Sequence, residues 1–250
     1  MVILGGGESG VGAALLAKQK GYDVFVSDSG SLKEDYRSEL KQAGIEFEES
    51  GHDEKRILRS DEVMKSPGIP EKNEMVRKIR AKGIEVISEI ELAYRFKGNS
   101  KIIAITGSNG KTTTTALTFH ICEKAGLDCA MVGNIGFSFA RQVAEDPKQL
   151  YVTEVSSFQL DDIKAFRPDI AVLTNITEDH LDRYEYRFEN YIRSKFRITM
   201  NQQPNDYFIF CEDDEVTMKY LKQFNIQSKL LPFSMRKELT HGAFDRKSVV

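Results

Sequence analysis

Short apolar runs alternate with longer segments of helical periodicity along most of the chain. In the first hundred residues this pattern predicts strands at 2–4, 24–26 and 84–87, and helices at 13–20, 32–43 and 73–82. Strands that alternate with helices are typical of a parallel sheet covered by helices. The N-terminal part is therefore predicted to have an α/β fold.

The same alternation begins again in the second part. Strands are predicted at 102–105, 151–155, 170–173 and 207–210, and helices at 114–125, 188–200 and 215–224. The polar stretch 97–100 separates the two series, so we predict domains at 1–97 and 98–250. Residues 234–250 are polar and show no pattern of a strand or helix that would complete the second domain. Both ends of the chain look abrupt. We therefore expect the chain to be a piece of a longer protein.

The composition narrows the class of protein. The 250 residues are 40% hydrophobic and 29% charged, with a net charge of −3, as in ordinary globular domains. No clustered basic segment suggests nucleic acid, and no apolar run reaches the ~20 residues of a membrane span. No secretory signal is recognisable, so a cytoplasmic protein with free thiols at Cys122, Cys129 and Cys211 is expected.

The most informative motif is TGSNGKTT at 106–113, between a predicted strand and a predicted helix. Backbone amides at a helix N-terminus surround an anion, the lysine adds a positive charge, and the threonine hydroxyl can bind Mg²⁺. Ile105 occupies the place where the general phosphate-loop pattern has glycine, so this is a variant loop. The alternative is a simple turn before a helix. The predicted nucleotide-binding residues are Gly107, Ser108, Asn109, Gly110, Lys111, Thr112 and Thr113.

A second glycine-rich turn, GGGESG at 5–10, fits the spacing GxGxxG directly after the first predicted strand. Asp28 ends the second strand, where an acid can meet a ribose. The pattern predicts a Rossmann-like domain that binds a dinucleotide or another diphosphate, such as a UDP-sugar. The alternative is a tight turn that only lets helix and strand pack closely.

Polar residues follow two further predicted strands. Glu154 and His180 would both face the loop with Lys111 and Thr112 if these strands are neighbours. A carboxylate there can bind Mg²⁺, although the residues alone also allow Glu154 to pair with a lysine and His180 to cap a turn. Lys195 lies between two arginines on a predicted helix, which by itself indicates a solvated face.

Four motifs in order give the chain a family resemblance: TGSNGKTT, VGNIG at 132–136, EVSSFQL at 154–160 and NITEDHLDRY at 175–184. Together with LGGGESG and SPGIP at 66–70, they resemble the Mur ligases, which are ATP-dependent amide-forming enzymes of peptidoglycan precursor synthesis. The resemblance implies a Rossmann-like UDP-binding domain followed by a P-loop ATPase domain. It further implies that the end of the ATPase domain and the C-terminal amino-acid-binding domain are absent here.

The resemblance also implies roles for single residues. Lys111 would hold the β- and γ-phosphates of ATP, and Thr112 and Glu154 would bind a first Mg²⁺. His180 would bind a second Mg²⁺, and Lys195 matches a lysine that the family carbamylates and uses near the metal. The residues that would contact the substrate are Ser9, Asp28 and Ser29 for the uridine diphosphate, and Asn134 and Ser156 for the muramoyl-alanine part.

Within the family, the motifs are most similar to members that join D-glutamate to UDP-N-acetylmuramoyl-L-alanine. Small-molecule substrates, ATP and Mg²⁺ are thus expected, with neither nucleic acid nor membrane as partner, and a monomer is expected. Three alternatives stay open: a Mur-type ligase for another amino acid, an NAD-binding oxidoreductase, and a nucleotide-binding module without catalysis of its own.

Overall fold

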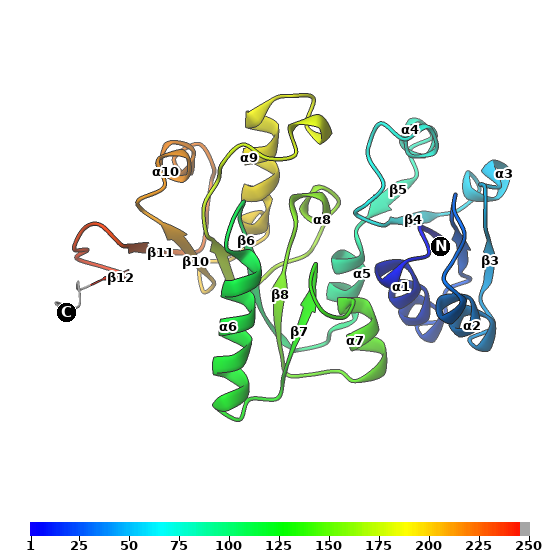
Figure 1. Cartoon of the computed structure of the whole chain (residues 1–250), viewed down its shortest axis with the longest axis horizontal. Helices are drawn as coiled ribbons and strands as arrows, with labels where there is room; N and C mark the ends of the chain where they lie inside the picture. The colour runs from blue at the N-terminus through cyan, green and yellow to red at the C-terminus, as the bar shows by residue number, and fades with distance from the viewer. Residues whose placement is uncertain (246–250) are drawn as a thin grey trace. The chain divides into compact units, whose positions relative to one another are not determined.

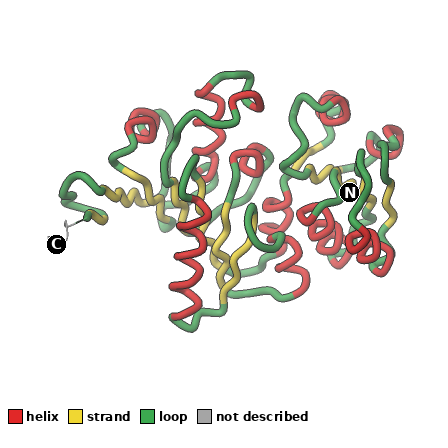
Figure 2. The backbone as a smooth tube through the Cα atoms, viewed as in Figure 1, coloured by secondary structure: helices red, strands yellow, loops and turns green. Residues whose placement is uncertain are grey.

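A computed structural model describes residues 1–245 and divides them into two compact units. The first contains 1–99, 132–148 and 161–166, and the second contains 100–131, 149–160 and the remainder from 167. Strands and helices alternate through both units, as Figure 2 shows. Every strand pair with a recorded register is parallel. The predicted α/β class with parallel sheets is confirmed.

The first unit is built on a five-stranded sheet in the order β3-β2-β1-β4-β5 (Figure 1). The sheet's apolar residues, among them Leu4, Val63 and Val86, pack with α4 in one buried cluster. Its elements are β1 (Val2–Leu4), α1 (Glu8–Gln19), β2 (Phe25–Ser27), α2 (Glu34–Gln42), β3 (Glu46–Glu48), α3 (Glu54–Ile57), β4 (Glu62–Lys65), α4 (Glu74–Ala81), β5 (Glu85–Ile87), α5 (Glu89–Phe96) and, from later sequence, α7 (Phe139–Glu145).

The second unit is built on a sheet in the order β12-β11-β10-β9-β6-β8-β7. The strand before the phosphate-loop motif, β6, is therefore central and lies between β8 and β9. The elements of this unit are β6 (Lys101–Thr106), α6 (Lys111–Lys124), β7 (Cys129–Gly133), β8 (Leu150–Glu154), α8 (Ser157–Asp161), β9 (Ile170–Leu173), α9 (Phe188–Phe196), β10 (Tyr207–Cys211), α10 (Glu215–Leu221), β11 (Lys229–Ser234) and β12 (Ala243–Phe244), with 3₁₀ turns at Leu181–Arg183 and Arg197–Thr199.

The predicted strands and helices all occur, with shifted ends. The prediction that residues 234–250 contain no closing element is wrong for 243–244, which pair with residues 233–234 as β12. Residues 246–250 of that stretch lie outside the described residues. Several short elements were not predicted, and β3 and β4 are examples. Strand β3 has two glutamates around one phenylalanine, and β4 ends in a buried lysine. Such strands lack the apolar pattern that predicts them.

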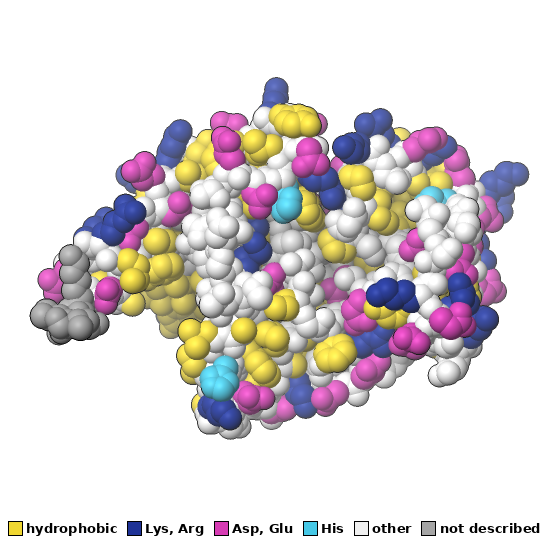
Figure 3. Space-filling view, viewed as in Figure 1, with side chains coloured by type: hydrophobic (Ala, Val, Ile, Leu, Met, Phe, Trp, Pro, Cys, Tyr) yellow, Lys and Arg dark blue, Asp and Glu magenta, His cyan; other side chains and the backbone are white. Residues whose placement is uncertain are grey.

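No helix within residues 1–245 is both long and apolar enough to cross a membrane. Acidic and basic side chains are interspersed over the face shown in Figure 3, without a continuous basic patch on that face. Cys122, Cys129 and Cys211 form no disulfide in the part of the chain that the structure describes.

Candidate functional site

The loop between β6 and α6 has the backbone conformation that its glycines allow. Gly107 has φ 146° and Gly110, which precedes the first residue of α6, has φ 80°. A Cβ at Gly107 would lie 1.9 Å from the Thr174 hydroxyl oxygen. Any larger residue at position 107 would therefore be strained and would also clash.

The segment that follows β9 holds this loop in place. The Ser108 amide donates to the Asn175 carbonyl at 2.9 Å, and the Asn109 amide donates to Asn175 Oδ1 at 3.0 Å. The Thr174 hydroxyl donates to the Asn109 carbonyl at 2.7 Å. The loop conformation is thus supported by side chains 65 or more positions later in the chain. The sequence analysis did not assign this supporting role, although Thr174 and Asn175 directly follow the predicted strand at 170–173 and Asn175 begins the NITEDHLDRY motif.

Lys111 and Thr112 occupy the first turn of α6, where the helix dipole and unpaired amides favour an anion. The Lys111 ammonium donates to the carbonyls of Gly107 and Ser108 at 2.8 and 2.9 Å. Its charge is therefore held against the loop itself. This arrangement of amides, helix N-terminus and ammonium is suited to the phosphates of a nucleotide.

Glu154 comes to the same place from the neighbouring strand. It ends β8 and is paired in register with Ile105 of β6. Its carboxylate, 2% exposed as a residue, accepts a hydrogen bond of 2.8 Å from the Thr112 hydroxyl. Two hard oxygen donors thus lie side by side next to the phosphate loop, and this donor set fits Mg²⁺ when phosphate oxygens complete its coordination. Thr112 and Glu154 are the predicted site residues that the structure brings together most directly.

Lys195 is buried, and the interpretation of this residue as part of a solvated face is wrong. It lies in α9 with 2% exposure, and its ammonium is 3.3 Å from the Thr106 hydroxyl at the end of β6. It also lies 5.2 Å from the centre of the Tyr191 ring. Charge spacing along a helix does not show which side packs on a sheet. Here the packing turns Lys195 inward.

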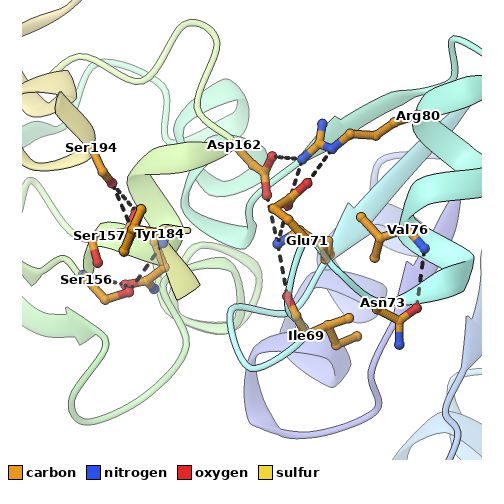
Figure 4. Close-up of polar contacts among 12 residues, drawn as sticks. Ile69, Glu71, Asn73, Val76, Arg80, Ser156, Ser157, Asp162, Tyr184 and Ser194 are labelled. Atoms are coloured by element: carbon orange, nitrogen blue, oxygen red, sulfur yellow. Dashed lines mark hydrogen bonds and ion pairs between the residues drawn. The ribbon is translucent and has the colours of Figure 1, made fainter. Parts of the chain in front are cut away.

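Hydrogen bonds between buried serines position the helix that carries Lys195. The Ser194 hydroxyl donates to the Ser157 carbonyl at 2.9 Å, and the Tyr184 hydroxyl donates to Ser194 at 3.2 Å, as Figure 4 shows. Tyr191 of the same helix shares a hydrogen bond of 3.1 Å with the Ser108 hydroxyl. Burial raises the pKa of the Tyr191 phenol above its ordinary value of 10. Tyr191 is a supporting residue that the sequence analysis missed.

His180 follows the same loop-supporting segment and has the left-handed backbone conformation, with φ 50°. Its ring lies 5.2 Å from the Phe158 ring, and its Nε2 is 3.4 Å from an Asp179 carboxylate oxygen. The side chain is 52% exposed. These contacts are with Phe158 and Asp179 and do not test whether His180 binds a metal ion. The role of His180 in a second metal site therefore stays a prediction.

The glycine-rich turn of the first unit is tightly packed. A Cβ at Gly10 would lie 1.8 Å from the Gly5 carbonyl oxygen, and one at Gly5, which has φ 90°, would lie 2.8 Å from the Ser66 hydroxyl. A Cβ at Gly7 would meet nothing within 4 Å. The outer glycines therefore allow close packing of strand and helix, whereas the middle one leaves the backbone open to a ligand.

Asp28 lies beside this turn, as its spacing predicts. One carboxylate oxygen accepts from the Gly6 amide at 2.6 Å and the other from the Gly30 amide at 2.7 Å. Ser29 is exposed next to it, and Ser9 is half-buried in the first turn of α1. The three predicted uridine-diphosphate residues thus border one turn.

A buried ion network supports the neighbouring SPGIP segment at 66–70. The Lys65 ammonium, at the end of β4, lies 3.1 Å from an Asp162 oxygen and donates to the Ile69 carbonyl at 3.2 Å. Asp162 and Glu71 both accept hydrogen bonds from Arg80 of α4, as Figure 4 shows. Because Lys65 and Asp162 are each 3% exposed, removing either would leave the other charge buried with one partner fewer, Glu71 remaining for Lys65 and Arg80 for Asp162.

The two residues predicted for the muramoyl-alanine part belong to different units. Asn134 is an exposed residue of the first unit, and Ser156 precedes α8 in the second. The Ser156 amide and hydroxyl both contact Gln159 Oε1, and the Gln159 amide donates to the Ser156 hydroxyl at 3.3 Å. This reciprocal arrangement is a capping box that begins α8. Within residues 1–245, no group of three His, Cys, Asp or Glu side chains could hold a metal by itself.

The two sheets, the phosphate loop at the C-terminal end of a central strand and the second glycine-rich turn define an α/β nucleotide-binding protein. The family model of the Mur ligase middle domain matches residues 105–248, and that of the MurD N-terminal domain matches residues 1–75. The chain belongs to the Mur ligase family.

Relatives and solved structures agree with this assignment. The chain is 55% identical to a UDP-N-acetylmuramoylalanine–D-glutamate ligase of Cytophaga hutchinsonii, over all of this chain and 56% of the relative. It is 53% identical to the ligase of the same name from Bacteroides fragilis, over 95% of this chain and 53% of the relative. The chain therefore spans about half the length of these relatives.

The fold is similar to that of a UDP-N-acetylmuramate:L-alanyl-gamma-D-glutamyl-meso-diaminopimelate ligase from Neisseria meningitides, with a TM-score of 0.65 and 19% identity over 96% of this chain and 81% of that one. A UDP-N-acetylmuramate-alanine ligase from Thermotoga maritima gives a TM-score of 0.56 and 20% identity over 94% of this chain and 52% of that one. At these identities the likeness establishes the fold.

Proposed function

We propose that this chain is the UDP-substrate-binding and ATP-binding part of an enzyme that joins D-glutamate to UDP-N-acetylmuramoyl-L-alanine. The observation that carries the proposal is the Thr112–Glu154 pair beside the phosphate loop, in a chain with relatives of that name at 52–55% identity. The substrates, the cofactors ATP and Mg²⁺, a cytoplasmic location and a monomeric state are parts of this proposal. So are the domains at 1–97 and 98–250.

The chemistry explains why such a site is needed. A carboxylate is a poor electrophile, because attack by an amine would have to expel oxide. Transfer of the γ-phosphoryl group of ATP to the carboxylate gives an acyl phosphate, from which the amine expels phosphate. Negative charge gathers in both steps, so positive groups fixed in advance lower the barrier.

Residues of the second unit supply this environment in the proposal. Lys111 and the amides of the loop bind the β- and γ-phosphates, and the α6 N-terminus orients them. Thr112 and Glu154 hold Mg²⁺, which when bound neutralises phosphate charge. His180 contributes to a second metal site. Lys195, if carbamylated, becomes an anion beside Thr106, which suits a role next to metal ions.

Residues of the first unit bind the UDP-sugar in the proposal. Ser9, Asp28 and Ser29 contact the uridine diphosphate at the glycine-rich turn, and Asn134 contacts the muramoyl-alanine part. The open backbone at Gly7 supports a diphosphate at this turn. The oxidoreductase alternative leaves the Thr112–Glu154 pair without a task.

Calorimetric titration of this chain with UDP-N-acetylmuramoyl-L-alanine, ATP with Mg²⁺, and NAD tests the proposal. Binding of the first two, and not of NAD, is the expected result. Binding of NAD alone would favour an oxidoreductase. Binding of the UDP compound with no ATP binding would show that the phosphate loop has another role.

A further inference from the structure

Glu8 is an unusual residue for a turn that receives a diphosphate, since its negative charge would repel the ligand. Its carboxylate is instead paired with α7. One oxygen lies 3.0 Å from Arg141 Nε and accepts from the Ser138 amide at 3.2 Å, and the other accepts from Arg141 Nη2 at 3.4 Å. Glu8 therefore connects the first turn of α1 to the beginning of α7.

Ser138 is the centre of this connection. It precedes α7, is 2% exposed, and its hydroxyl accepts from the Arg141 amide at 3.1 Å. The same hydroxyl donates to Glu89 Oε1 at 2.8 Å, and the Ala140 amide donates to that oxygen at 2.5 Å. Three helices of the first unit thus meet at one serine.

A glycine in α1 makes this close approach possible. A Cβ at Gly12 would lie 2.2 Å from the Ser138 hydroxyl oxygen and 3.0 Å from Arg141 Cβ. Arg141 itself is mostly buried, and its Nη1 lies 2.8 Å from Glu39 of α2 and 3.0 Å from Glu145. Shape and charge therefore both specify how α7 sits on α1.

The VGNIG segment at 132–136, called the 132–136 loop below, begins with the last two residues of β7 and is followed by Phe137 and Ser138. It bends at Gly133 and Gly136, which have φ 104° and 78°, and the Gly133 amide donates to the Phe137 carbonyl at 3.1 Å. The loop exposes Asn134. Anchoring Ser138 on Glu8 consequently fixes one end of this loop beside the glycine-rich turn.

We propose that Glu8, Ser138 and Arg141, supported by Glu89, are positioning residues that hold the 132–136 loop beside the glycine-rich turn so that both segments bind one UDP-sugar. The inference rests on the proposed function. The turn receives the diphosphate, and the loop contacts the sugar-linked part. These residues set only the position of the 132–136 loop. Substituting them should therefore weaken the affinity for the whole UDP-sugar more than the affinity for UDP.

The test is a pair of affinities measured on the 250-residue chain, one for UDP and one for UDP-N-acetylmuramoyl-L-alanine. Arg141→Met, Glu8→Gln and the double variant should each bind the UDP-sugar about 10-fold more weakly, as expected for loss of about 1.4 kcal/mol. Their affinity for UDP should change less than about 3-fold. The double variant should lose no more affinity for the UDP-sugar than the single variant with the larger loss, because the two residues act as one pair.

Two further variants separate positioning from folding. Lys78→Met removes an ion-pair partner of Glu54 and Glu74 elsewhere in the same unit and should leave both affinities unchanged. Arg141→Lys retains a cation near Glu8 and should recover part of the lost affinity. Thermal unfolding of every variant shows whether it is folded at the temperature of the titration.

The outcomes distinguish the two proposals. If the unmodified chain binds UDP-N-acetylmuramoyl-L-alanine while Arg141→Met and Glu8→Gln bind it equally well, the positioning role is refuted and the proposed function stands. Equal losses for UDP and the UDP-sugar would also refute it, since they indicate general damage. If the unmodified chain does not bind the UDP-sugar, the proposed function fails first and the inference with it.

Discussion

At the scale of single residues, burial decides what several charged groups can do. Glu89, the first residue of α5, is fully buried, and desolvation raises the pKa of its carboxyl from 4.5 to about 7, although hydrogen bonds from Ala140 and Ser138 at the beginning of α7 oppose the shift. Its second oxygen has no hydrogen-bond partner among the described residues. Neither effect can be read from the acidic stretch in which Glu89 stands.

Glu89 should make stability depend on pH. The native carboxyl binds its proton more tightly than the unfolded one, so folding takes up a proton between about pH 4.5 and 7. The free energy of unfolding should therefore fall as pH rises through this range, by on the order of 1–3 kcal/mol, and this contribution should be constant above it. Urea unfolding of the unmodified chain and of Glu89→Gln at several pH values measures the difference. Parallel pH profiles for the two proteins would contradict the assignment.

Lys111 should contribute to nucleotide affinity directly. Lys111→Ala removes a charge-assisted contact to phosphate, worth about 1.5–3 kcal/mol, so ATP should bind roughly 10- to 100-fold more weakly. Lys124→Ala, at the other end of α6, is the matched control and should bind ATP normally. Calorimetry on both variants measures the effect, and equal affinities would remove Lys111 from the site.

At the scale of elements, the phosphate loop depends on a neighbour in the sheet. The residues after β9 hold the loop through Thr174 and Asn175, while Glu154 reaches Thr112 from β8. The site thus exists because β6 lies between these two strands. The same loop sequence in a sheet with another strand order would lack the support from the residues after β9 and from Glu154.

Gly107 tests this dependence. Gly107→Ala places a Cβ against the Thr174 hydroxyl in a conformation unfavourable for alanine, so it should cost about 1–3 kcal/mol of stability and abolish ATP binding. Gly126→Ala is the matched control, because Gly126 also has a positive φ, 76°, and its Cβ would meet nothing within 4 Å. The control should lose about 1 kcal/mol and keep ATP binding. Chemical unfolding and calorimetry on both variants check these outcomes.

At the scale of the whole molecule, the two units contain different predicted sites. Asp28 and the glycine-rich turn belong to the first unit, and Lys111 and Glu154 belong to the second. Each unit has its own parallel sheet. The two binding activities of the proposal should therefore respond to different substitutions.

Asp28→Ala should weaken binding of UDP-N-acetylmuramoyl-L-alanine about 10-fold or more, because it frees the amides of Gly6 and Gly30 that order the turn. ATP affinity should stay within about 2-fold of the unmodified chain. Lys111→Ala should show the reverse pattern. Loss of both affinities in either variant would indicate general unfolding, which circular dichroism would reveal.

The sequence by itself determined the parallel α/β class, the two glycine-rich turns and the family, because these depend on local periodicity and on motifs of adjacent residues. Lys111, Thr112 and Glu154 were recognised in this way. Only the tertiary structure decided that Lys195 is buried and that Tyr191 supports Ser108, because helix packing brings them to the site. It alone also revealed the pairing of Glu8 with Arg141, since an interaction between residues 133 positions apart leaves no local pattern in one sequence.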